Sequence, residues 1–220
     1  TFETWPAKTF NKATCNPGIG PKLKNEFPEI KTYVRFAKIR DPEVVIEDSE
    51  FNEEAFYFAD SSVFSIFPYE LLAGSAGEAL LNPNSVVLSR DLAMKYFKES
   101  NPLGQVSSVN GRNYTLTGIM DAAPKSHLQC NALLSMEDTS RMSNNMKAYG
   151  GDTYTYVLTS KKTDIKDLQA KLPGFYDTYL KIEDGYDFQL KFEPLENVHF
   201  SSKKLENDLP TMNIIYLYIL

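Results

Sequence analysis

Apolar and polar residues alternate along several stretches of the chain, which is the pattern of strands that bury one face. The clearest alternation covers residues 30–39, 106–119, 153–159 and 187–195. Within the second stretch, Asn110-Gly111 separates two alternating runs. This dipeptide favours a type I′ turn, because both central residues of that turn need a positive φ. The pattern therefore predicts four stretches of strand and a tight hairpin at Asn110-Gly111.

Shorter apolar runs add to the predicted strands. Residues 44–47 and 51–59 are strand-like and are separated by Asp48-Ser49-Glu50. With residues 30–39 they predict a meander of two or three antiparallel strands. Further short strands are predicted at residues 84–88 and 128–134.

Four stretches carry helix signals, at residues 21–27, 62–67, 90–97 and 164–179. Ser89 can cap the third of these helices, and Asp60 or Ser61 can cap the second. Pro173-Gly174 must kink or end the fourth, because proline removes a backbone donor. Strand, helix and strand then follow one another over residues 153–195, which is a βαβ-like unit. The predicted class is therefore α+β, a mixed α/β domain.

The composition is that of an ordinary folded domain. The chain has 220 residues, of which 42% are hydrophobic and 24% are charged, so it can form a sizeable core. Its formal net charge is -6, and its basic clusters are no longer than lysine pairs. Because an acidic surface repels phosphates, nucleic acid and lipid headgroups are not expected partners.

Few residues are candidates for catalysis or metal binding. The chain has two histidines, His127 and His199, and two cysteines, Cys15 and Cys130. The spacing His127-x-x-Cys130 is typical of zinc ligands, but the sequence has no second close pair to complete a site. It also has no G-x-S-x-G motif that would expose a nucleophilic serine. We expect no catalytic residue, no metal or cofactor in this domain, no enzyme activity, and two unbridged cysteines.

The sequence finishes on an apolar run, Asn213-Ile-Ile-Tyr-Leu-Tyr-Ile-Leu220. A helix needs about 20 apolar residues to span a bilayer, so this run alone is too short. Two interpretations remain open. The run is either the first turns of a membrane-spanning helix or a C-terminal strand or helix that packs on the core.

Eight segments carry motifs that occur together in one known family. Residues 82–97 match a strand–helix signature, V-V-[LI]-S-x-x-L-A-x-K-Y-F, and Asn101-Pro-Leu-Gly104 matches a D-P-[IL]-G turn. Residues 58–74 begin Phe58-Ala-Asp and match a run that begins F-A-D-x-x-F-F. The remaining segments are residues 21–30, 114–119, 124–127, 197–201 and 213 onward. In this order, the motifs resemble the periplasmic core domain of ABC-transporter permeases of the MacB/FtsX type.

The resemblance implies a two-lobed periplasmic domain, inserted between the first two transmembrane helices of a permease. One lobe, porter-like and built from both chain ends, would comprise residues 1–60 and 146–220 and contain the βαβ-like unit. The other lobe, sabre-like and inserted, would comprise residues 61–145 and contain the hairpin.

The resemblance also implies a function. A separate cytoplasmic subunit would hydrolyse ATP, and this domain would couple that reaction to substrate export or to mechanotransmission across the membrane. The expected partners are the transmembrane helices of the same permease, the cytoplasmic ATPase subunit, and a second permease copy or half. The expected location is the inner (cytoplasmic) membrane, with this domain on the periplasmic or extracytoplasmic side. The alternative is a stand-alone extracytoplasmic protein that binds a ligand between two lobes.

The same resemblance assigns the final apolar run to the start of the second membrane helix. Its tyrosines suit the interface of a bilayer, where an apolar ring and a polar hydroxyl are both satisfied. The expected membrane-proximal residues are Asn213, Ile214, Ile215, Tyr216, Leu217 and Tyr218.

Overall fold

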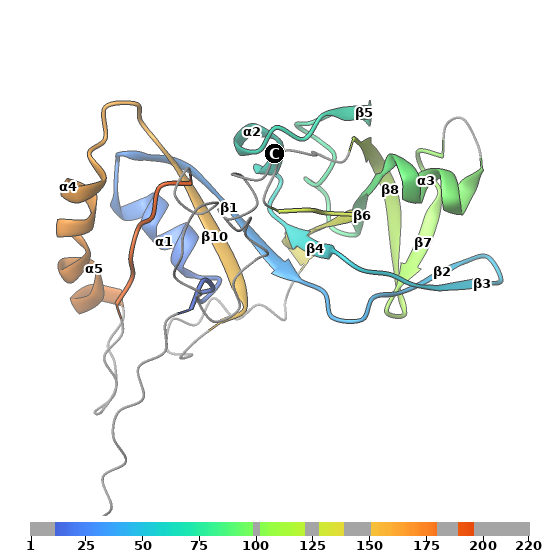
Figure 1. Cartoon of the computed structure of the whole chain (residues 1–220), viewed down its shortest axis with the longest axis horizontal. Coiled ribbons are helices and arrows are strands. Elements are labelled where there is room, and N and C mark those ends of the chain that lie inside the picture. The colour runs from blue at the N-terminus through green and yellow to red at the C-terminus, as the bar shows by residue number, and fades with distance from the viewer. Residues whose placement is uncertain (1–11, 99–101, 122–127, 139–150, 180–188, 196–220) are drawn as a thin grey trace, which may run out of the picture.

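The computed structural model describes residues 12–98, 102–121, 128–138, 151–179 and 189–195. In this part of the chain, ten strands form one mixed sheet that runs through the molecule (Figure 1). The strands are β1 (Ile30–Lys38), β2 (Glu43–Ile46), β3 (Ser49–Asn52), β4 (Phe56–Ala59), β5 (Leu71–Gly74), β6 (Ser85–Ser89), β7 (Val106–Val109), β8 (Arg112–Met120), β9 (Ala132–Ser135) and β10 (Thr153–Thr159).

The sheet has the order β10-β1-β4-β9-β6-β8-β7-β2-β3, and β5 also pairs with β8. The pairs β4–β9 and β6–β8 are parallel, and the other pairs are antiparallel. The described helices are α1 (Ile19–Glu26), α2 (Val63–Ile66), α3 (Arg90–Phe97), α4 (Ile165–Ala170) and α5 (Leu172–Tyr179). The predicted α+β class is confirmed.

Different elements lie at the two ends of the sheet (Figure 1). Helices α1, α4 and α5 lie beside β10 and β1, whereas α3 and the hairpins β2–β3 and β7–β8 lie at the other end. The central strands are buried on both faces. Successive side chains of a strand point to opposite sides of the sheet, and on each side they enter an apolar cluster. Val87 and Leu133 enter one apolar cluster, and Val86 and Leu134 enter another. A third cluster joins α1 to α4 and α5.

The hairpin predicted at Asn110-Gly111 is confirmed. Val109 pairs with Arg112 across the turn, and the φ angles of Asn110 and Gly111 are 50° and 76°. The Asn110 side chain also fixes the neighbouring strand, because its Oδ1 accepts the backbone N–H of Glu43 at 2.8 Å. The tip of β7–β8 is thereby connected to the start of β2.

We expect Gly111→Val to lower the free energy of unfolding by about 1 kcal/mol or more, because a β-branched residue resists positive φ. Gly77→Val is the matched control: a Cβ at Gly77 would meet no atom within 4 Å, and the same holds at Gly111. The two variants therefore differ in backbone angle rather than in available space. Equal denaturation midpoints for both variants would contradict the prediction.

Two helix predictions are confirmed in detail. The helix α3 covers Arg90–Phe97 as predicted, and Ser89 Oγ accepts the backbone N–H of Leu92 at 3.3 Å. The predicted helix over residues 164–179 is divided into α4 and α5, with Lys171 between them. Pro173 lies in the first turn of α5, where its missing N–H breaks no helical hydrogen bond.

The predicted meander of two or three antiparallel strands is confirmed for the pair β2–β3 and wrong in placing β1 next to β2. The strand β1 pairs with β10 and β4, whereas β2 pairs with β3 and β7. Only β2 and β3 form an antiparallel hairpin of consecutive strands in this region. Local alternation predicted the strands, but the contact with Asn110 places β2 at the far end of the sheet.

The strand predicted at residues 187–195 is also wrong where the structure describes it. Residues 189–195 form no strand, so the second strand of the βαβ-like unit is missing from this segment. Side chains of α4 and α5 bind its backbone instead: the N–H of Leu190 donates to the Tyr176 hydroxyl, and that of Phe192 donates to Gln169 Oε1. These groups are thus satisfied without a neighbouring strand.

The division into two lobes stays a prediction. The proposed boundary at residues 60–61 falls between β4 and β9 in the sheet, and these strands are hydrogen-bonded to each other. The hairpin β2–β3 belongs by sequence to the expected end-built lobe, yet it pairs with β7 of the expected insert.

Candidate functional site

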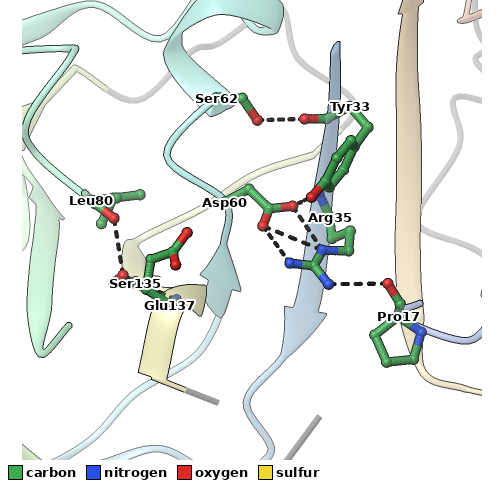
Figure 2. A network of polar contacts seen from close by, with 8 residues as sticks. All are labelled: Pro17, Tyr33, Arg35, Asp60, Ser62, Leu80, Ser135 and Glu137. Atoms are coloured by element: carbon green, nitrogen blue, oxygen red, sulfur yellow. Dashed lines mark hydrogen bonds and ion pairs between the residues drawn. The ribbon is translucent and has the colours of Figure 1, made fainter. Parts of the chain in front are cut away.

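A buried ion pair joins the middle of β1 to the chain that leaves β4. Arg35 lies in β1 and Asp60 follows β4 directly. Their side chains are only 12% and 10% exposed. Arg35 Nη2 donates to Asp60 Oδ1 at 2.7 Å, and Arg35 Nε donates to Asp60 Oδ2 at 2.9 Å (Figure 2). Two parallel N–H···O bonds of this kind fix both the distance and the orientation of the partners.

Further contacts extend this pair into a network (Figure 2). The backbone N–H of Arg35 donates to Asp60 Oδ2 at 2.7 Å. Arg35 Nη1 donates to the carbonyl of Pro17, just before α1, at 3.0 Å. The Ser62 hydroxyl donates to the carbonyl of Tyr33. We call these five residues the clasp, because they hold three segments together: the approach to α1, the strand β1 and the turn into α2.

The electrostatics of the clasp favour the ionised pair. Burial disfavours the charge of Arg35, but hydrogen bonds and the negative charge of Asp60 outweigh it, so the pKa of Arg35 is raised. The guanidinium carbon also lies 5.5 Å from the centre of the Tyr33 ring. Burial, followed by the charge of Asp60, raises the pKa of the Tyr33 phenol. Arg35 therefore remains charged and Tyr33 neutral at physiological pH.

The geometry of the clasp suits structural coupling. Both carboxylate oxygens of Asp60 accept hydrogen bonds from Arg35, so the carboxylate is already engaged. The arrangement therefore fixes the positions of the three segments relative to one another.

The clasp was not predicted from the sequence. Asp60 or Ser61 was expected to cap the helix at 62–67, but α2 begins at Val63, and its N-cap, Ser62, makes no side-chain capping bond. One signal was available: Arg35 stands between the apolar residues Val34 and Phe36, and an arginine requires a partner if it is buried. The identity of that partner depends on the pairing of β1 with β4, which alternation alone does not fix.

The predicted membrane-proximal residues, Asn213, Ile214, Ile215, Tyr216, Leu217 and Tyr218, lie outside the described residues. His127 and His199 lie outside them too. In the described ranges, no group of three or more His, Cys, Asp or Glu residues is placed to hold a metal ion. The helices of these ranges include none that is long and apolar enough to cross a membrane.

Both cysteines are free thiols, as expected. Cys15 forms a β-bridge with Thr153 and donates its thiol hydrogen to Thr155 Oγ1 at 3.2 Å. Cys130 is buried in the core, with its Sγ 3.5 Å from the Tyr69 hydroxyl. Burial raises the pKa of the Cys130 thiol to about 12, although the Tyr69 contact works in the opposite direction.

We expect both thiols to react slowly with an alkylating reagent in the folded chain at pH 8. With a pKa of about 12, the thiolate fraction of Cys130 at this pH is only about 10⁻⁴. Burial raises the pKa of Cys15 as well. Counting thiols in denaturant should give two reactive groups, whereas a count of zero there would reveal a disulfide.

Comparison with known proteins identifies the family. The family described as "MacB-like periplasmic core domain" matches residues 11–174 of this chain. The chain belongs to this family. The MacB-like domain is part of a transporter permease, so the chain is an extracytoplasmic domain of an ABC-transporter permease. No curated protein matches the chain.

Solved structures share the fold of this MacB-like domain. A domain of a protein described as a permease, from Porphyromonas gingivalis, has a TM-score of 0.68 and 19% identity, and the match covers 83% of each chain. The periplasmic region of MacB from Actinobacillus actinomycetemcomitans has a TM-score of 0.56 and 14% identity over 77% of each chain. The extracellular domain of the ABC-type transporter YknZ from Gram-positive bacteria has a TM-score of 0.53 and 15% identity, over 77% of this chain and 87% of that chain.

Proposed function

We propose that this MacB-like domain couples ATP hydrolysis by a separate cytoplasmic subunit to substrate export or mechanotransmission across the membrane. The observation that carries the proposal is the continuous sheet. It connects the end near α1, α4 and α5, where the described chain starts and finishes, to the hairpins β2–β3 and β7–β8 at the other end (Figure 1). A hydrogen-bonded sheet is stiff along this path, so displacement at one end reaches the other.

The clasp supports the same proposal. It ties the approach to α1 directly to β1 and to the turn after β4, so movement of the chain before α1 is passed into the sheet. In the proposed permease that movement comes from the preceding transmembrane helix. The other partners would be the second transmembrane helix, the ATPase subunit and a second permease copy or half.

Distances between spin labels in the full-length transporter test the proposal. Ser49 is exposed at the tip of β2–β3, and a Ser49→Cys variant in a Cys15→Ser background carries one accessible thiol in this domain for each permease copy. We expect the distance distribution between the labels to change when ATP binds and to return after hydrolysis. A separate Lys161→Cys variant places the label at an exposed position near α4. It measures movement at the opposite end of the sheet and serves as the matched control.

Two results would contradict the proposal. One is the same label distances in every nucleotide state. The other is a full-length gene in which no hydrophobic span flanks this segment, which would instead favour a stand-alone protein that binds a ligand between lobes.

A further inference from the structure

Residues 189–195, which we call the strap, are held on α4 and α5 by side chains that bind its backbone. The Tyr176 hydroxyl accepts the N–H of Leu190 at 2.8 Å and donates to the carbonyl of Leu190 at 2.9 Å. Gln169 Nε2 donates to the same carbonyl at 2.9 Å, and Gln169 Oε1 accepts the N–H of Phe192 at 2.8 Å. We call Gln169 and Tyr176 the latch.

Apolar contacts add to the attachment of the strap. Leu190 and Phe192 pack against the cluster that joins α1, α4 and α5, and both remain partly exposed. The residues between and beside them, Gln189, Lys191 and Glu193, are exposed. A hollow of about 330 Å³ also remains between the strap and the helices, lined by Gln169, Leu172, Pro173, Tyr176, Gln189 and Leu190. The strap therefore lies in its groove without filling it.

The attachment of the strap differs in kind from that of the adjacent strands. The strand β1 is paired along both edges, with β10 and with β4, and Val34 and Phe36 are fully buried. The strap has neither a strand ladder nor a fully buried side chain among its residues. The four hydrogen bonds that hold the strap are only partly buried. Segments with few fully buried apolar contacts open at lower free energy than core strands.

We propose that the strap is releasable, and that the latch sets how easily it detaches from α4 and α5. In sequence, the strap lies between α5 and the apolar run that begins at Asn213. The inference rests on the proposed function in one respect: in a permease, movement of the second membrane helix would act on the strap. The strap would then detach before β1 or the clasp, and limit the force that enters the sheet from that side.

Hydrogen exchange of single amides in this chain tests the strap directly. We expect the amides of Leu190 and Phe192 to exchange at least about tenfold faster than those of Val34 and Phe36, because local release precedes global unfolding. The two latch residues act on different amides. Gln169→Ala should accelerate Phe192 by about tenfold, and Tyr176→Phe should accelerate Leu190 by about tenfold, because each variant removes the acceptor of that N–H.

The exchange experiment has a matched control and clear contrary results. Lys166→Ala alters an exposed side chain of α4 and should leave both strap amides unchanged. Exchange of Leu190 and Phe192 as slow as that of Val34 and Phe36 would show that the strap does not detach. Unchanged exchange in both latch variants would show that Gln169 and Tyr176 do not hold it.

A second experiment asks whether release matters in the full-length transporter. With Gln169→Ala and Tyr176→Phe combined, we expect the nucleotide-dependent change in the Ser49 label distance to shrink at least about twofold, because a looser strap transmits less displacement. If the wild-type transporter shows the change and the latch variant shows it undiminished, the role of the strap in transmission is wrong while the proposed function stands. If the wild type shows no change, the proposed function fails, and the exchange data alone decide whether the strap is releasable.

Discussion

Asp60→Ala is expected to lower the free energy of unfolding by about 3–5 kcal/mol, because it leaves the charge of Arg35 buried without its partner. The guanidinium cannot escape by losing its proton, because arginine stays protonated in proteins. Without Asp60, burial still disfavours its charge and the main group that offsets this is gone. The substitution also removes the acceptor of the Arg35 backbone N–H. Urea denaturation followed by circular dichroism measures the loss.

The exposed ion pair between Arg40 and Asp152 provides the control, with side chains that are 82% and 71% exposed. Asp152→Ala should cost less than about 1 kcal/mol, because solvent screens such pairs. The double variant Arg35→Met/Asp60→Ala should be more stable than Asp60→Ala alone, since no unpaired charge is then buried. Equal losses for Asp60→Ala and Asp152→Ala would show that burial does not govern the clasp.

Phe36→Ala is expected to destabilise the chain by about 3–5 kcal/mol through the cavity that it leaves. Phe36 is fully buried, and its ring makes edge-on contacts with Tyr57, Phe67 and Tyr156 at centroid distances of 6.4, 5.4 and 5.8 Å. Aromatic pairs of this geometry add about 0.5–1.5 kcal/mol beyond burial of area. Calorimetry should show a markedly lower melting temperature.

Leu81→Ala tests whether that loss depends on packing, because Leu81 is 53% exposed. Its effect should stay within about 0.5 kcal/mol. A loss for Phe36→Ala that is no larger than the loss for Leu81→Ala would mean that the ring cluster contributes little to stability.

The sequence predicted best those features that nearby residues determine. Asn110-Gly111 requires positive φ at adjacent positions, so the β7–β8 hairpin is encoded within a few residues. Ser89 and the apolar face that follows it likewise define α3 locally. The family resemblance was carried by short motifs of the same kind, and the comparison over residues 11–174 confirms it.

Features that depend on distant partners were not predicted. Residues 189–195 alternate like a strand, but Tyr176 and Gln169 satisfy their backbone from the helices instead. Asp60 has the local character of a helix cap, yet Arg35 occupies its carboxylate. In both cases the local pattern is compatible with two outcomes, and tertiary contacts select between them.

The pairing of β1 with β10 has a consequence for the newly made chain. Ile30 pairs with Thr159, so more than half of the chain must be synthesised before this edge of β1 can acquire its partner. Pairing between segments so distant in sequence is slow, because the long intervening loop must first close. Until then, β1 presents an unpaired edge that another chain could bind. The first half of this domain is therefore most vulnerable to aggregation during synthesis, and that period ends only when β10 becomes available.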